Sequence, residues 1–280
     1  MFTFASSNIH VSLKAEPITQ LGPITITNSM IYGLVCAILI AFVMILAAKK
    51  IGVTAKKGFS QIIEIIIEFV LGMLEGVFGN RAQAVKFAPV FGTFFLFIIF
   101  NNLLGLVPLV GPGLSVNVDG AHTPLFRPFT ADLNATIAMA VIAIIIVQIL
   151  SIKEQGGKNH LKHYFTDKPL NPINLFIGIL EVFGEFTRIL SLSLRLFLNT
   201  AVGEILIAVF TSLVASGGRT PVAAIPIVLF EVLVAGIQAY VFTVLTATYL
   251  GLAVAHAHDS HEEEHHTESV HKVETEHAGV

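Results

Sequence analysis

Long apolar runs dominate this sequence and limit what the chain can fold into. Residues 30–48, 89–107 and 134–152 are each 19 residues long and contain few polar side chains. A helix of that length crosses a hydrocarbon core of about 30 Å. Hydrophobic residues make up 54% of the chain and charged residues only 12%, which lies outside the range of soluble globular domains. We therefore predict an all-α integral membrane protein.

Two further apolar stretches are too long for helices that cross a membrane perpendicularly. Pro172 and Pro221 each follow a residue that can cap a helix, and proline is tolerated in a first helical turn. The helices predicted from these signals cover 172–215 and 221–255. At 1.5 Å per residue, the first would be about 66 Å long and the second would exceed the hydrocarbon core by about 20 Å. Both helices are expected to tilt strongly.

The segment between the first two spans has an amphipathic pattern and is predicted as a helix at 59–78. Four of its polar residues fall within about 60° of one another around that helix: Gln61, Glu64, Glu68 and Glu75. A helix at the membrane interface with its carboxylates in water explains this pattern, whereas a catalytic acid cluster would need groups from other elements. The loop at 108–131 is rich in proline and glycine, so it is expected to be irregular or partly hairpin-like.

Basic residues are distributed unevenly between the two sides of the predicted membrane domain, 30–255. Ten Lys and Arg residues fall in the loops after the first and third spans, and three fall in segments on the other side. By the positive-inside rule, the N-terminal segment 1–29 lies outside and the basic loops lie in the cytoplasm. That segment resembles neither a signal nor a transit peptide. This orientation is the one expected in a bacterial plasma membrane, and an organelle membrane is the less favoured alternative.

The last segment, 256–280, holds seven of the eleven histidines together with many acidic residues. Paired histidines could capture a transition metal, but no apolar scaffold is present to fix a coordination geometry. We therefore expect a disordered, solvated cytoplasmic tail, with no metal site and no cofactor. Because the acidic excess of the chain lies largely in this tail, the charge balance gives no reason to expect nucleic-acid binding.

Polar residues inside the predicted 172–215 helix form a stripe around Arg195. Four of them fall within about 80° of Arg195 around the helix: Glu181, Glu185, Arg188 and Asn199. Glu204 falls about 180° away. A charged side chain at membrane depth is costly unless it faces protein or water, and by default it marks an ion path.

A structural interpretation competes with a functional one for several of these residues. Arg188 is close enough in sequence to Glu181 and Glu185 to pair with them, or it could extend to the membrane interface. Asp132 precedes the apolar run of the third span and could cap that helix, although it also forms a polar strip with Asn134 at the outer end. Both interpretations stay open here.

Arg195 and two glutamates favour a functional interpretation. Arginine stays charged even where it is poorly solvated, so Arg195 would be a permanent cation in an apolar setting. Glu204 and Glu231 carry carboxyl groups, which can take up and release protons. Gln238 follows Glu231 by seven residues and shares its helix face within about 20°. The combination indicates a proton route with a fixed positive barrier.

Three stretches of the sequence resemble subunit a of the F-type rotary ATP synthase: SLSLRLFLNTAVGEIL at 191–206, GIQAYVFTVLTATYL at 236–250 and FTADLNATIAM at 129–139. The resemblance extends over about 30–255, and its SLxxRLFxN core is highly specific. It implies a non-catalytic stator subunit, embedded in the lipid bilayer, that carries protons and contacts a rotating ring of c subunits and the peripheral-stalk b subunits. It also implies that the last two helices lie nearly horizontally against the ring.

The same resemblance implies roles for individual residues. Arg195 would face the ring carboxylate and prevent protons from passing directly between two offset half-channels, with Gln238 near it as a polar support. The other implied positions are Glu204 and Glu231 lining the half-channel open to the outside, Asp132 and Asn134 toward its mouth, and Glu181 and Arg188 on the cytoplasmic side.

The chain departs from the family pattern at two places. Family members commonly have a histidine and a glutamate where this chain has Glu204 and Glu231. If these two carboxylates are close, like charge favours keeping a proton on one of them. Leu198 replaces the glycine usual before Asn199, which bears on how closely that turn approaches its neighbour. The coupling ion could be sodium instead of the proton, because the family selects the ion largely in the ring.

Two other functional classes fit a chain of this composition. A secondary transporter would bind a solute near the bilayer midplane, usually between inverted repeats, and no clear internal repeat is visible. A passive membrane scaffold would have no reason to retain Arg195, Glu204 and Glu231 at membrane depth. Copurification with small two-helix ring subunits would favour the stator over the transporter.

Overall fold

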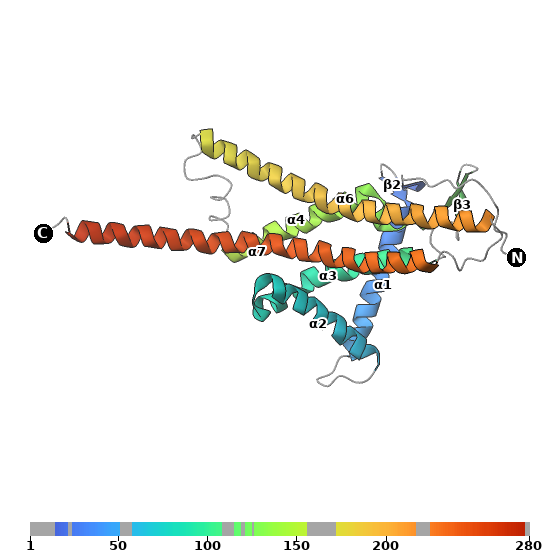
Figure 1. The fold of residues 1–280 in the computed structure, drawn as a ribbon, viewed down its shortest axis with the longest axis horizontal. Coiled ribbons are helices and arrows are strands. Elements are labelled where there is room, and N and C mark those ends of the chain that lie inside the picture. Colours follow the sequence, from blue (N-terminus) through green and yellow to red (C-terminus); the bar gives the residue numbers. More distant parts are fainter. Residues whose placement is uncertain are drawn as a thin grey trace.

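The helices and strands follow in the order β1, β2, α1, α2, α3, β3, β4, η1, α4, α6 and α7 (Figure 1). This computed structural model describes residues 15–21, 24–50, 58–107, 115–118, 121–124, 126–155, 172–216 and 225–277. The helices are α1 (Asn28–Lys50), α2 (Phe59–Phe78), α3 (Arg81–Gly105), the 3-10 helix η1 (Phe129–Ala131), α4 (Leu133–Gln155), α6 (Pro172–Ser216) and α7 (Ile225–His277). The strands form two antiparallel hairpins, β1 (Pro17–Leu21) with β2 (Ile24–Thr27) and β3 (Ser115–Val118) with β4 (Ala121–Pro124).

Five of the described helices are long and apolar enough to cross a membrane. Their apolar segments are Asn28–Lys49, Arg81–Gly105, Leu133–Glu154, Gly178–Ile207 and Ile225–Val254. Many of their large hydrophobic side chains are exposed, which is the arrangement that a lipid environment requires. The prediction of an all-α, multi-pass membrane protein is confirmed.

The core lies where α3, α4, α6 and α7 pack together, with α2 against its edge. Large buried side chains such as Phe91, Leu196 and Phe242 fill this region. Ala140 and Ala239 are completely buried in the same cluster. Small residues at such positions let helix backbones approach closely, which is how membrane helices gain packing energy when lipid is as apolar as their side chains.

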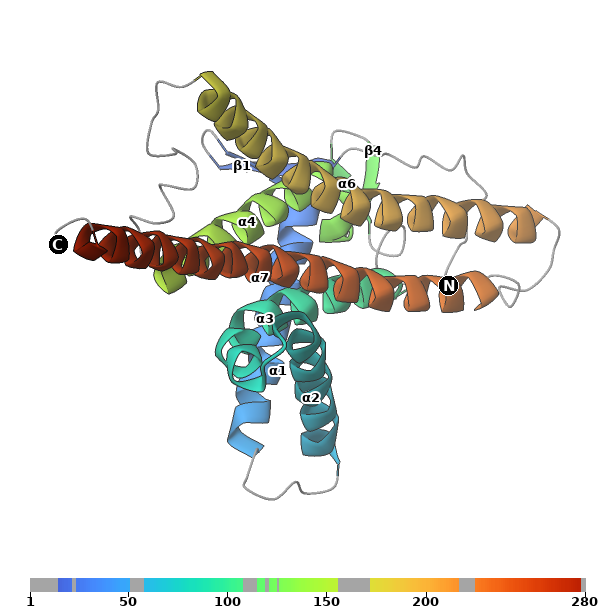
Figure 2. The ribbon, with the colours of Figure 1, turned by 60° about the vertical axis from the view of Figure 1, so that its left-hand side comes forward.

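The last two helices are much longer than a membrane crossing needs. α6 has 45 residues and α7 has 53, which corresponds to lengths of about 68 Å and about 80 Å. Figures 1 and 2 show α7 running across α1 at a steep angle in both views. If α1 crosses the membrane near its normal, α7 must therefore be strongly tilted. This agrees with the tilt that the helix lengths predict.

Two helix boundaries differ from the sequence prediction. α3 begins at Arg81 and not at residue 89, because the side chain of Asn80 caps it by accepting from the Ala82 amide at 2.8 Å. Pro89 is accommodated inside this helix, where the Thr93 hydroxyl donates to the Pro89 carbonyl. The backbone of α7 stays helical up to His277, which differs from the disordered tail expected from residue 256. Neither glycine nor proline interrupts residues 252–277, so nothing in the sequence forces the helix to end.

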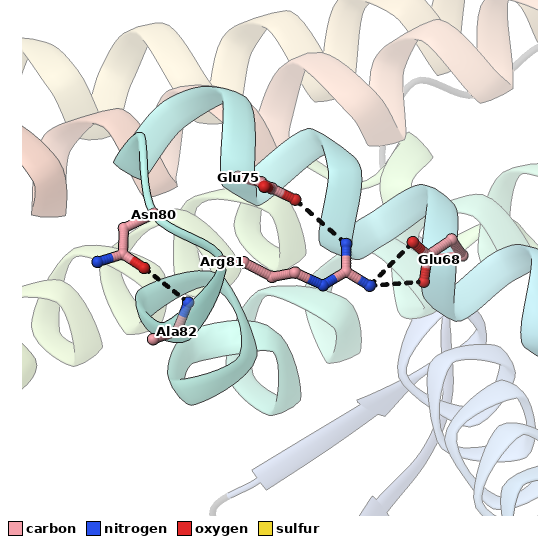
Figure 3. Close-up of polar contacts among 5 residues, drawn as sticks. All are labelled: Glu68, Glu75, Asn80, Arg81 and Ala82. Carbon is pink, nitrogen blue, oxygen red and sulfur yellow. Dashed lines mark hydrogen bonds and ion pairs between the residues drawn. The ribbon is translucent and has the colours of Figure 1, made fainter.

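The turn between α2 and α3 holds the amphipathic helix against the membrane domain. Gly79 adopts a left-handed conformation with φ 66°, which favours glycine and allows the sharp turn. Arg81 donates to Glu68 at 3.0 and 3.1 Å and to Glu75 at 3.2 Å (Figure 3). These three side chains are 42% to 61% exposed, so the carboxylates of α2 face outward as the helical pattern predicts.

Candidate functional site

A cavity of about 40 Å³ lies between α3, α6, α7 and the segment that leads into α4. Its wall contains both carboxylates that the sequence predicts for a proton path, Glu204 from α6 and Glu231 from α7. Polar groups of Asn102, Asn199 and Thr200 also line it. One water needs about 10–15 Å³ of such space, so the cavity has room for a few waters between acidic and amide groups.

Glu231 is held in this cavity by close packing against α6. Its residue is only 8% exposed, and its carboxyl group lies directly over Gly203. A Cβ atom at position 203 would overlap the Glu231 carboxyl group. Glycine at this position therefore creates the space into which the carboxyl group fits.

Glu204 faces a buried cation that the sequence analysis did not select. The Arg127 side chain is 7% exposed, and its Nη2 lies 3.9 Å from Glu204 Oε2. The same nitrogen donates to the Ala131 carbonyl at 3.2 Å. Opposite unit charges at such a distance attract by about 4 kcal/mol at an effective dielectric of about 20, before the cost of desolvating them. Arg127 therefore influences the carboxylate strongly.

Asn199 and Gln238 connect the cavity to the middle of α6. Asn199 Nδ2 donates to Gln238 Oε1 at 3.4 Å, joining α6 to α7. Gln238 is 5% exposed, and its buried Nε2 has no hydrogen-bond partner among the described residues. Leu198, the residue before Asn199, is 52% exposed. The Asn199–Gln238 contact forms with leucine at this position.

Arg195 is exposed on α6, one helical turn before Asn199. Within the described part of the chain its side chain forms no hydrogen bond or ion pair, and none joins it to Gln238. Its exposed neighbours are mainly apolar: Leu194 is 41%, Leu198 52% and Val202 49% exposed, and Ser191, one turn earlier, is an exposed hydroxyl residue. A permanent cation therefore lies on a mainly apolar, outward-facing surface of a membrane helix.

The other arginine of α6 is fully engaged within the chain. Arg188 Nη1 donates to Glu185 Oε1 at 2.5 Å, and the guanidinium lies 4.9 Å from the centre of the Tyr249 ring on α7. Glu181 lies one turn before Glu185 and is partly buried. The structure thus shows the pairing that was one of two interpretations for Arg188, although Glu185 and not Glu181 is the partner at hydrogen-bonding distance.

Asp132 caps α4 and also ties it to α1. Its Oδ1 accepts from the Asn134 amide at 3.1 Å, and its Oδ2 accepts from the Ser29 hydroxyl at 2.7 Å. Asp132 is 7% exposed, whereas the Asn134 side chain is exposed. Neither residue lines the cavity. The capping interpretation of Asp132 is therefore correct, and a place at the mouth of an outer path stays a prediction for both residues.

Sequence reasoning missed the groups that shape the cavity. Arg127 was counted only as a loop charge, and Asn102 was treated as part of an apolar span. Thr130 donates to Asn102 Oδ1 at 2.7 Å, so this asparagine is held at the cavity wall by the segment before α4. The signal available in the sequence was the paired Asn101–Asn102 inside an otherwise apolar helix, where polar side chains need partners.

Comparisons with known proteins identify the family of this chain. A family model described as the ATP synthase A chain matches residues 30–251. ATP synthase subunit a of Moorella thermoacetica is 32% identical over 88% of this chain and 99% of its own length. The subunit a of Streptococcus pneumoniae is 30% identical over 84% and 94%. "ATP synthase subunit a 2" of Chlorobaculum tepidum is 33% identical over 85% and 66%. The chain belongs to the ATP synthase subunit a family.

Proposed function

We propose that this chain is the stator half of a rotary proton path, with two offset half-channels separated by Arg195. As a member of the subunit a family, the chain is part of the membrane-embedded, proton-translocating portion of an ATP synthase. The half-channels, the role of the arginine and the individual partner subunits go beyond family membership. They rest on the geometry around α6 and α7.

The position of Arg195 carries the proposal. An exposed, unpartnered guanidinium among leucine and valine side chains is unfavourable in lipid. The same residue is favourable if it faces a carboxylate on another protein. A ring of c subunits that presents one carboxylate after another to this surface would supply that partner. Arg195 would then attract each carboxylate in its ionised form and block direct proton transfer past it.

The cavity supports a path from one side toward this surface. Glu204 and Glu231 would exchange protons with water in the cavity, and the Asn199–Gln238 pair lies between the cavity and Arg195. Asn199 is four residues from Arg195, which is about 6 Å along the helix. A proton leaving the cavity near Asn199 would therefore reach the ring close to the arginine. In the proposed topology this path opens to the outside.

The second half-channel would begin at the other end of α6. Glu181, Glu185 and Arg188 lie on this part of the helix, and Arg188 contacts Tyr249 of α7. The positive-inside rule places this end on the cytoplasmic side of a bacterial plasma membrane, with the N-terminus outside and the C-terminus inside. The peripheral-stalk b subunits would hold the chain against the rotor. No catalytic step is assigned to the chain itself.

ATP-driven proton pumping in inverted vesicles tests this proposal with the assembled complex. Native chain, Arg195→Ala and Arg195→Lys are compared after the amount of complex in each vesicle preparation has been equalised. Loss of pumping in the alanine variant, with the subunits still assembled, is the expected result. Near-native pumping in both variants would show that Arg195 has only a structural role.

A further inference from the structure

The residues that lead into α4, 126–132, form a buried strap across the outer ends of several helices. It packs so closely that a Cβ atom on Gly105 of α3 would lie 2.8 Å from Pro128, and one on Gly33 of α1 would lie 2.5 Å from Phe129. Ring pairs and a hydrogen bond fix it further: Phe126 with Tyr32, Phe129 with Phe97, and Thr130 with Asn102. The strap is therefore a rigid part of the cavity wall.

Arg127 projects from this strap toward the cavity carboxylates. One guanidinium nitrogen donates to the Ala131 carbonyl of the same strap, which fixes the cation relative to the wall. The same nitrogen lies 3.9 Å from Glu204 Oε2 on α6. Within the described residues, this is the ion pair that Glu204 forms. Glu231 lies in the same cavity and is positioned by contact with Gly203.

The distance between the two charged groups is informative. A separation of 3.9 Å is too long for a hydrogen bond but short enough for strong attraction in a poorly solvated setting. Such a contact orients the Glu204 carboxylate while its oxygen atoms stay available to accept a proton. A shorter, bidentate pair would instead occupy those oxygens.

We propose that Arg127 is a positioning residue for proton transfer, holding Glu204 in the cavity from the outer strap. The inference deepens the proposed function, because it requires that Glu204 carries protons. Arg127 itself takes no proton, since its guanidinium stays charged at any physiological pH. Its contribution is to fix where the first carboxylate of the outer path lies.

The competing explanation is that Arg127 only supports the strap through the Ala131 carbonyl. The two explanations differ in whether the effect of an Arg127 substitution depends on the presence of the Glu204 carboxylate. A residue that acts through Glu204 loses its effect once the Glu204 carboxylate is gone, whereas a purely structural residue keeps its effect. Phe129 offers a matched control, because its ring anchors the same strap against Phe97 on α3.

The experiment is a double-mutant cycle on ATP-driven proton pumping, normalised to assembled complex. Arg127→Gln and Glu204→Gln are each expected to slow pumping by about 10-fold, and the double variant should be within about twofold of Glu204→Gln. Phe129→Leu should reduce pumping by the same factor in both backgrounds. Arg127→Lys, which keeps the charge, should retain about half of the native rate or more.

Each possible failure has a distinct meaning. If Glu204→Gln pumps at the native rate, the proposed outer path is wrong, and the inference falls with it. If Glu204→Gln is impaired but the losses of Arg127→Gln and Glu204→Gln multiply in the double variant, only the positioning role is overturned. If Arg127→Gln fails to assemble, the Arg127→Lys variant is used in its place. A complex with Arg127→Lys that assembles but loses as much pumping as Glu204→Gln overturns the proposal.

Discussion

Two arginines on α6 lie seven residues apart and have opposite environments. Arg188 is bonded to Glu185, and its guanidinium lies against the Tyr249 ring, so its charge has partners within the chain. Arg195 lies on almost the same helix face, about 20° away, and is exposed without a described partner. Arginine thus has partners within the chain at position 188 and no described partner at position 195 of the same helix.

The difference distinguishes charged groups that stabilise this chain from charged groups whose partner lies on another subunit. A partnered charge can be explained by folding alone, because its removal leaves a buried partner behind. An unpartnered charge at membrane depth has no such explanation and points to a partner in the assembled complex. The predictions below remove one kind of group or the other, beginning with the largest expected effect.

Exchanging each arginine for alanine tests the comparison directly. Arg195→Ala should lower ATP-driven proton pumping by at least about 100-fold, equivalent to about 2.7 kcal/mol, because nothing else on that surface carries its charge. Arg188→Ala should lower pumping by less than about 10-fold and should instead reduce the thermal stability of the purified complex. Equal losses of pumping in the two variants would remove the distinction between them.

Gly203→Ala tests whether pumping depends on the position of the Glu231 carboxyl group in the cavity. The added methyl group meets the Glu231 carboxyl group, so the carboxyl must leave its place, and a fall in pumping of about 10-fold is expected. Gly72→Ala on α2 is the matched control, since nothing lies within 4 Å of its added Cβ atom. The control should pump normally. Native pumping by Gly203→Ala would mean that the position of Glu231 is unimportant.

Asp132→Ala tests a group whose partners all lie within the chain. The substitution removes an α4 cap and the bond to Ser29, so a loss of about 1–2 kcal/mol in stability is expected. Pumping per assembled complex should fall by no more than about threefold. Thermal unfolding in detergent gives the first quantity and vesicle pumping the second. A severe pumping defect in a stable complex would instead favour a place for Asp132 in the proton path.

The smallest effect is expected for Arg81→Ala. The ion pairs with Glu68 and Glu75 are exposed to more than 40% at every side chain, and surface pairs of this kind contribute little. Neither the melting temperature nor the pumping rate should change measurably. A clear defect in complex assembly would reveal that this surface of α2 contacts another subunit.

The helices and the principal charged residues were accessible from the sequence because both follow from local rules. Apolar runs of 19 residues specify membrane helices, and the length of the 172–215 segment already requires tilt. Arg195, Glu204 and Glu231 attract attention because charges are rare and costly in such segments. The early start of α3 escaped prediction because the span was bounded by its apolar run, whereas the Asn80 cap lies nine residues before that run.

The cavity was not predictable from periodicity, because its wall combines residues from distant segments. Pro128 and Glu204, which both line the cavity, are 76 positions apart, and the strap that carries Pro128 lies in a loop with no helical pattern. Nothing in the sequence distinguishes Gly203 from other helix glycines, because its contact with the Glu231 carboxyl group joins two different helices. The partner of Arg188 was likewise ambiguous, since Glu181 and Glu185 both share its side of the helix.

Passive proton conduction through the membrane sector, after removal of the ATP-hydrolysing part, tests the central claim most directly. If Arg195 separates two half-channels, the complete Arg195→Ala complex should lose ATP-driven pumping, and its membrane sector, once that part has been removed, should still conduct protons when a membrane potential is imposed. Arg188→Ala complexes should keep more than about a tenth of the native pumping rate. An Arg195→Ala sector that assembles normally and is impermeable to protons would contradict the account, because removing a barrier between two open paths cannot close them.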